Sequence, residues 1–218
     1  MLALLNQLAV SFDLPILDWI QAHLQCGFLD AVMPIVTLFG EGGIFWIAWA
    51  VLMLVFPKTR KTGIAMAIAL VMGVLICNVT LKPLVARPRP YDYQLEHFGV
   101  TIKLLIDAQH DYSFPSGHTA TAFMGAEFLR KEYWDVSPWI GVAGYAVAAG
   151  TGFFRMYNNR HWLTDVLTGA GIGILSTQAA YWLYPTITKT FFRKRYKNIF
   201  ISPYFSKEEK GVSCHIAF

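Results

Sequence analysis

The stretch TGIAMAIALVMGVLICNVTL, residues 62–81, carries no charged side chain. A helix that crosses a membrane needs roughly 20 mostly apolar residues, so this stretch predicts a transmembrane span. It runs directly into KPLVARPRP, residues 82–90, in which cations alternate with prolines. The sequence therefore predicts a stiff basic segment at the point where a span meets the membrane surface.

Apolar runs recur along the chain, at residues 44–56, 119–129, 138–154 and 166–184. Hydrophobic residues make up 55% of the 218 residues and charged residues 15%, whereas soluble domains average about 25% charged residues. The first two of these runs reach spanning length only with flanking residues, and buried helices of a soluble protein are the alternative for them. We expect an all-α polytopic membrane helix bundle with five to six transmembrane helices.

Three regions follow from composition. Residues 1–42 predict N-terminal amphipathic interfacial helices, or else a short sixth span around residues 28–39. Residues 43–188 form the transmembrane domain, and residues 189–218 a basic and then polar cytosolic tail. The apolar residues expected in the headgroup layer are Leu14, Ile16, Leu17, Trp19 and Ile20.

Positive charges collect in three places, at residues 58–61, 130–131 and 189–197, and residues 1–57 contain no Lys or Arg. With five spans these clusters fall on one face, which the positive-inside tendency makes cytoplasmic. The net charge of +4 is thus explained by topology, and we expect no nucleic-acid partner. Glu127, near the end of an apolar run, is expected to pair with Arg130 at the cytoplasmic interface.

The basic segment offers Lys82, Arg87 and Arg89 to an anion. Because Pro83 and Pro88 oppose a regular helix, we expect the span to end near residue 81 and the three cations to converge in the loop. Guanidinium groups bind phosphate oxygens in a forked way, and an ammonium adds a compact charge. A basic cluster that only contacts anionic headgroups is the alternative.

A second segment, PSGH at residues 115–118, precedes another apolar run. Pro115 suits a helix start, where Ser116 and Gly117 would expose backbone amides to an anion. His118 is a candidate general acid, because imidazole titrates near neutral pH. An N-cap serine beside an interfacial histidine is the alternative.

A third segment, RMYNNRHWLTD, covers residues 155–165. His161 and Asp165 are four residues apart, so one helical turn places them on one face. The carboxylate can accept the proton of one ring nitrogen and leave the other as a nucleophile. The alternative is a local hydrogen bond at a helix start. Arg155 adds a further cation, and no spacing of Cys, His or Asp matches a metal site.

With these residues the chain resembles the type 2 phosphatidic acid phosphatase superfamily, whose signature reads K-x6-RP, PSGH and SR-x5-H-x3-D. The resemblance implies that His161 is the nucleophile, Asp165 its partner and His118 the general acid, without cofactor or metal. The residues implied to bind phosphate are Lys82, Arg89, Arg155, Ser116 and Gly117. Phe154 stands where the family usually has Ser, which removes one potential hydrogen bond to phosphate.

The resulting hypothesis is a membrane lipid phosphatase that acts at the extracytoplasmic face of a bacterial inner membrane through a phosphohistidine. Undecaprenyl diphosphate is the first candidate substrate, followed by lipid A, phosphatidylglycerol phosphate and phosphatidate. A non-catalytic protein that binds anionic lipids would explain the cations but not the two histidines and the carboxylate. Vanadium haloperoxidases share the catalytic architecture, but they are soluble. The sequence leaves the oligomeric state open.

Overall fold

Helices make up most of the regular structure of this chain. The computed structural model describes residues 5, 7–102, 104–105, 109, 111–191, 199–205 and 210–216, with side chains described as far as residue 187. Two compact units are present, Met1–Ala180 and Tyr181–Phe218. In chain order the elements are η1 (Ala9–Asp13), α2 (Leu14–His23), α3 (Gly27–Thr37), α4 (Ile44–Val55), α5 (Arg60–Val74), η2 (Leu75–Leu81), α6 (Lys82–Val85), α7 (Pro90–Phe98), α8 (Gly117–Tyr133), α9 (Pro138–Tyr157), α10 (Leu163–Phe191), β1 (Ile199–Phe205) and β2 (Lys210–Ile216).

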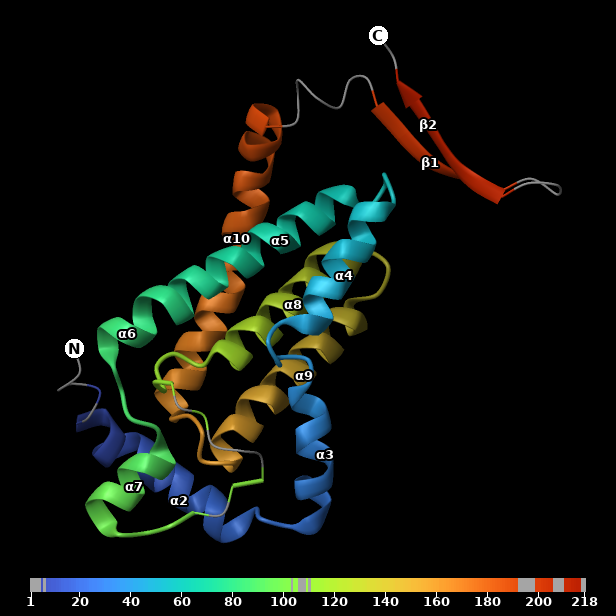
Figure 1. Cartoon of the computed structure of the whole chain (residues 1–218). Coiled ribbons are helices and arrows are strands. Elements are labelled where there is room, and N and C mark those ends of the chain that lie inside the picture. The colour runs from blue at the N-terminus through green and yellow to red at the C-terminus, as the bar shows by residue number, and fades with distance from the viewer. Residues whose placement is uncertain are drawn as a thin grey trace. The chain divides into compact units, whose positions relative to one another are not determined.

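The predicted all-α helix bundle is confirmed, and each of the five apolar runs lies in a helix (Figure 1). Within the described residues, the continuous stretch Arg60–Phe98 is long and apolar enough to cross a membrane, while Gly27–Thr37 and Ile44–Val55 are shorter apolar helices. The number of spans therefore stays a prediction.

The helix that contains the opening stretch does not end near residue 81, so that expectation is wrong. The helical path continues through η2 and α6 to Val85, and Ala86 then takes a left-handed conformation with φ 50°. Pro83 is the second residue of α6, which directly follows the π-helix η2. A proline lacks the N–H that an α-helix interior needs, but the first turn does not use it.

Helix α10 approaches α8 closely where its glycines face the α8 backbone. A Cβ atom on Gly169 would lie 2.4 Å from the carbonyl oxygen of Ser116, and one on Gly173 would lie 2.2 Å from that of Ala120. No larger residue fits at these two positions without moving a helix. The contact brings the beginning of α10 next to the beginning of α8, where two of the predicted segments lie.

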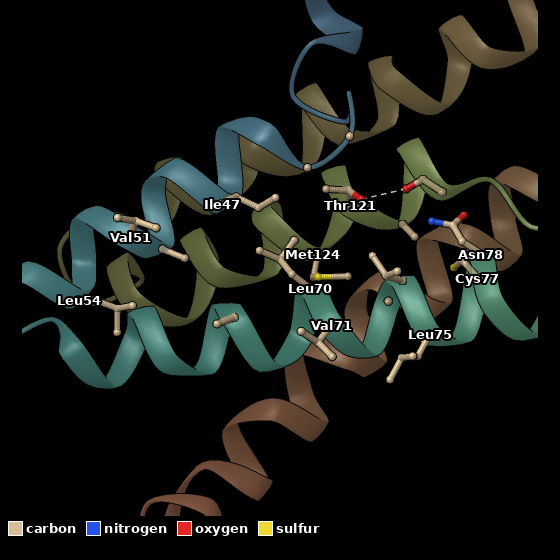
Figure 2. Close-up of a pocket in the computed structure, with 18 residues that line it drawn as sticks. Ile47, Val51, Leu54, Leu70, Val71, Leu75, Cys77, Asn78, Thr121 and Met124 are labelled. Atoms are coloured by element: carbon tan, nitrogen blue, oxygen red, sulfur yellow. Dashed lines mark hydrogen bonds between the residues drawn. The ribbon is translucent and has the colours of Figure 1, made fainter. Parts of the chain in front are cut away.

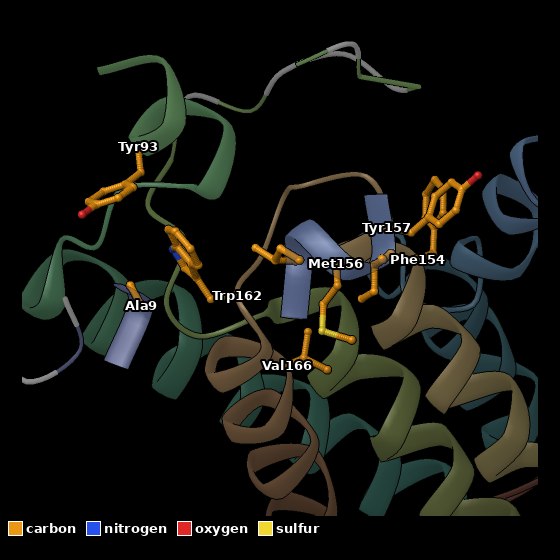
Figure 3. Close-up of a cluster of buried hydrophobic side chains, with 9 residues drawn as sticks. Ala9, Tyr93, Phe154, Met156, Tyr157, Trp162 and Val166 are labelled. Atoms are coloured by element: carbon orange, nitrogen blue, oxygen red, sulfur yellow. The ribbon is translucent and has the colours of Figure 1, made fainter. Parts of the chain in front are cut away.

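The N-terminal helices pack against the ends of α9 and α10 through a cluster of buried apolar side chains. Leu17 and Ile20 are buried in it, whereas Trp19 is 53% exposed. Leu17 and Ile20 thus face the protein, not the headgroup layer that was expected for them, because the cluster offers them an apolar surface. The buried members of the cluster, most of them labelled in Figure 3, are Ala9, Leu17, Ile20, Tyr93, Phe154, Met156, Tyr157, Trp162 and Val166.

Glu127 is buried in the bundle and has the predicted partner. Its carboxylate accepts hydrogen bonds from Arg130 at 2.6 and 2.7 Å and from the Tyr145 hydroxyl at 2.7 Å. A buried carboxylate satisfied in this way is structural. The sequence-based pairing is confirmed.

The second unit contains an antiparallel hairpin in which β1 pairs with β2, Ile199 opposite Ile216. The predicted polar tail did not include this hairpin. Residues 192–198, 206–209 and 217–218 lie outside the described part of the chain, as do the side chains of the predicted basic cluster at residues 189–197. The three-part domain division from the sequence stays a prediction.

Phe154, the departure from the resembled signature, belongs to the buried cluster. Its side chain is fully buried, and its ring stacks with that of Tyr157 at a centroid distance of 6.4 Å. The structure therefore gives this side chain a packing role.

We expect Phe154→Ser to destabilise the protein rather than to improve it. Truncating a buried Phe costs about 3–5 kcal/mol because a cavity is left behind. Thermal unfolding in detergent would measure the loss, with Phe98→Ser as control because Phe98 is 57% exposed. Equal melting temperatures of the two variants would contradict the packing role.

Candidate active site

Beneath the predicted segments lies a buried ion-pair array centred on Arg87. Its guanidinium donates to the Asp13 carboxylate at 2.7 Å and to the Asp165 carboxylate at 2.6 Å, and all three side chains are fully buried. Thr164 donates from its backbone N–H to Asp13 at 3.0 Å. Two buried carboxylates require a cation, so Arg87 turns inward. The expectation that Arg87 converges with the other cations of its segment is wrong.

Asp165 connects this array to the predicted nucleophile. Its Oδ2 accepts the Trp162 backbone N–H at 2.9 Å and a short hydrogen bond from the Ser113 hydroxyl. His161 Nδ1 lies 3.5 Å from Asp165 Oδ2 and 3.4 Å from Ser113 Oγ. The predicted pair is thus brought together, with Ser113 beside both. Sequence reasoning gave Ser113 no role, although it stands two residues before Pro115.

The second ring nitrogen of His161 faces the opposite way. Its Nε2 lies 3.3 Å from Nη1 of Arg89. A guanidinium can only donate, so Nε2 presents its lone pair and Nδ1 carries the proton toward Asp165 and Ser113. Burial, followed by the charges of Arg89 and Arg155, lowers the pKa of His161 well below the ordinary imidazole value. The imidazole is therefore neutral at pH 7, as a nucleophile must be.

Two of the predicted phosphate ligands meet at one carboxylate. Lys82 and Arg89 both form short ion pairs with Asp111. Although burial raises the pKa of the Asp111 carboxyl, the hydrogen bond and charge of Lys82 and the charge of Arg89 bring it below its usual value. The two cations are therefore placed to share an anion.

Arg155 brings a third guanidinium to the same site. It is fully buried, and its Nη2 donates to the Gln109 side chain at 2.8 Å. Its Nε and Nη1 have no hydrogen-bond partner among the described residues. Each buried donor left without a partner costs about 1–3 kcal/mol, so an anion bound here would be stabilised.

The beginning of α8 also borders the site. Ser116 is its N-cap: its hydroxyl accepts the Thr119 backbone N–H at 3.4 Å, and its own N–H donates to the Asp165 carbonyl at 3.1 Å. The expectation that the Ser116 amide is exposed to an anion is therefore wrong, because its N–H is already hydrogen-bonded to the Asp165 carbonyl of α10. Gly117 and His118 begin the helix, where backbone amides have no partner within the helix.

His118, the predicted general acid, has a partner that the sequence did not suggest. Its Nε2 lies 2.9 Å from Oε2 of Glu41, which belongs to the connection between α3 and α4. The two residues are far apart in the chain, and no short motif joins them. In the described part of the chain no three His, Cys, Asp or Glu side chains cluster as metal ligands would.

An apolar groove of about 380 Å³ leads to this site between α4, α5 and α8. Figure 2 shows Leu54 near one end of it and Asn78 near the other, and Gly117 also lines it. Val51, Val71 and Leu75 line the groove and are each at least half exposed. Apolar lining thus extends to the residue next to His118.

A family model described as the PAP2 superfamily matches residues 60–189, which is more than half of the chain. The chain belongs to the PAP2 superfamily. This confirms the resemblance drawn from the three segments.

Relatives of this PAP2 protein are named as lipid phosphatases. It is 56% identical over 71 residues to the lipid A 1-phosphatase of Porphyromonas gingivalis, a match that covers 33% of this chain and only 16% of that protein. It is 31% identical to the undecaprenyl-diphosphatase of Sulfolobus acidocaldarius, over 71% of this chain and 72% of the relative.

A solved relative gives the fold its membrane context. The crystal structure of a transmembrane PAP2 type phosphatidylglycerolphosphate phosphatase from Bacillus subtilis superposes with a TM-score of 0.63 at 25% identity. The match covers 86% of this chain and 89% of that one. This PAP2 protein is accordingly a membrane protein.

We expect Asp13→Asn to destabilise this PAP2 protein although Asp13 lies outside the family motifs. The substitution keeps the shape but leaves Arg87 with one carboxylate fewer, and breaking a buried ion pair costs roughly 3–5 kcal/mol. Thermal unfolding in detergent would measure this, with Asp18→Asn as the matched control because Asp18 is exposed on the neighbouring helix. A melting temperature unchanged from the parent would contradict the bracing role of Asp13.

Proposed function

We propose that this PAP2 protein is a membrane lipid phosphatase that works through a phosphohistidine on His161. The observation that carries the proposal is the placement of a buried, neutral imidazole whose Nε2 points toward Arg89. Lys82 and Arg155 add two further cations around the same space. A nucleophile surrounded by fixed positive charge suits phosphoryl transfer, which depends mainly on positioning and charge stabilisation.

In the first step Lys82, Arg89 and Arg155 hold the phosphate oxygens, and the Gly117 amide adds a donor. His161 Nε2 attacks phosphorus, the bond from phosphorus to the leaving oxygen breaks, and His118 gives that oxygen its proton. Asp165 and Ser113 stabilise the charge that develops on the His161 ring.

In the second step water attacks the phosphohistidine. His118, now neutral, takes a proton from that water as the bond from phosphorus to His161 Nε2 breaks. Inorganic phosphate leaves, and both histidines return to their starting states. These roles for His118, Asp165 and the phosphate ligands form part of the proposal, and Ser116 assists them by capping α8.

The apolar groove supports a lipid as the substrate. We assign the hydrocarbon chain of the substrate to it, because its lining runs from Leu54 to Gly117 and ends beside His118. Because lipid tails are as apolar as the lining, the groove can accept a chain from the bilayer by van der Waals packing while the phosphate reaches the cations. An anionic-lipid-binding protein without activity would leave the His161, Asp165 and Ser113 arrangement without a role.

Undecaprenyl diphosphate remains the first candidate substrate. It is supported by the relative named undecaprenyl-diphosphatase, which matches along most of both chains. Lipid A is the second candidate, favoured by the 56% identity to a lipid A 1-phosphatase over 71 residues. The charge distribution of the sequence supports a site on the extracytoplasmic face of a bacterial inner membrane.

The test is phosphate release by purified protein in detergent and EDTA. The lipids are undecaprenyl diphosphate, lipid A, phosphatidylglycerol phosphate and phosphatidate. We expect release from one of them at wild-type rates in His23→Ala, an exposed control, and a loss of at least about 10³-fold in His161→Ala. Release that requires an added divalent ion, or that survives in His161→Ala, would refute the proposed mechanism.

A further inference from the structure

Glu41 is a charged residue that contacts the catalytic arrangement without belonging to any of the three segments. Its carboxylate Oε2 lies 2.9 Å from His118 Nε2, and the His118 side chain is 13% exposed against 50% for Glu41. The carboxylate thus reaches from the solvent side onto a nearly buried imidazole.

The backbone around Glu41 is shaped to fit the first turn of α8. A Cβ atom on Gly40 would lie 2.6 Å from the His118 carbonyl oxygen, so only glycine permits this approach. Gly42 and Gly43 take positive φ values of 55° and 70°. The Glu41 N–H donates to the Leu38 carbonyl at 3.2 Å, and the Glu41 carbonyl accepts from Ile44 N–H at 3.1 Å. The connection is therefore held in place on both sides of Glu41.

The charges near His118 explain what this contact does. Burial, followed by the charges of Arg155 and Arg160, lowers the pKa of His118 below the ordinary imidazole value, and His161 lies close enough to interact with it. Glu41 opposes them, because a carboxylate in hydrogen-bond contact favours the imidazolium. The hydrogen bond from His118 also lowers the pKa of the Glu41 carboxyl, so the carboxylate is ionised at neutral pH.

We propose that Glu41 is the positioning residue that orients His118 and favours its protonated form for delivery of a proton to the leaving oxygen. The inference rests on the proposed function, since it presupposes that His118 is the general acid. One ring nitrogen of His118 is held by Glu41, which leaves the other for the leaving oxygen. Glu41 thus acts on the chemistry through His118 without contacting the phosphate.

The test compares two substrates that differ in their need for an acid. An alkyl phosphate such as dodecyl phosphate releases an alkoxide that must be protonated, whereas 4-nitrophenyl phosphate releases a stable phenolate. The rate of the first turnover, measured by rapid quench of reactions run in EDTA-containing buffer, reports the step in which His118 acts as acid. The variants are Glu41→Gln, Glu41→Asp and His118→Gln, with Glu96→Gln as control because Glu96 is an exposed carboxylate on α7.

We expect Glu41→Gln to slow the alkyl phosphate by about tenfold or more and the nitrophenyl ester by less than about twofold, since general acid catalysis contributes roughly 10²–10⁴. The alkaline limb of the alkyl phosphate profile should move to lower pH, because a less stabilised imidazolium loses its proton sooner. Glu41→Asp, which keeps the charge, should restore part of the rate. Adding Glu41→Gln to His118→Gln should cause no further loss.

Equal losses on both substrates would show that Glu41 only supports the fold, and unchanged rates on both would remove its role altogether. Either result overturns the inference while leaving the phosphatase itself intact. A parent protein that turns over neither substrate nor any lipid of the panel would instead overturn the proposed function, and the inference with it.

Discussion

The structure depends on one buried guanidinium shared by two buried carboxylates. Arg87 joins Asp13 of the N-terminal segment to Asp165 at the beginning of α10, and its guanidinium lies 5.0 Å from the centre of the Trp162 ring. None of the three charges could remain buried without the others, because isolated charges are too costly to remove from water. The array therefore fixes the relative positions of three segments that are distant in the chain.

The site is built in layers above this array. Asp165, with Ser113, holds the inner nitrogen of His161, and the outer nitrogen faces Arg89. Negative charge beneath the imidazole and positive charge above it match a reaction in which the ring becomes cationic while phosphate stays anionic. The short pairs from Lys82 and Arg89 to Asp111 show that this outer layer already holds a carboxylate where the cations converge. Glycine contacts between α8 and α10 bring His118 to the edge of the same space.

Much of this arrangement could be predicted from the sequence because the reacting residues lie in short segments with fixed spacings. The four-position spacing from His161 to Asp165 was sufficient to predict the pair, and the apolar runs on either side of the segments were sufficient to predict the helical bundle. Asp13, Glu41 and Ser113 were missed because each contacts a residue at least 48 positions away along the chain. No local sequence pattern records such a contact. Pro83 misled for a different reason, since a first-turn proline after a π-helix does not stop the helical path.

The central claim is that His161 carries the phosphoryl group between the two steps. The direct measurement is a rapid alkaline quench of the protein during turnover of a ³²P-labelled lipid phosphate, followed by mass spectrometry of the peptide that contains residue 161. The account predicts a phosphate on His161 that is stable in alkali and lost in acid, and that is absent from His161→Ala. Label on another residue, or rapid turnover without any labelled protein, would contradict the account.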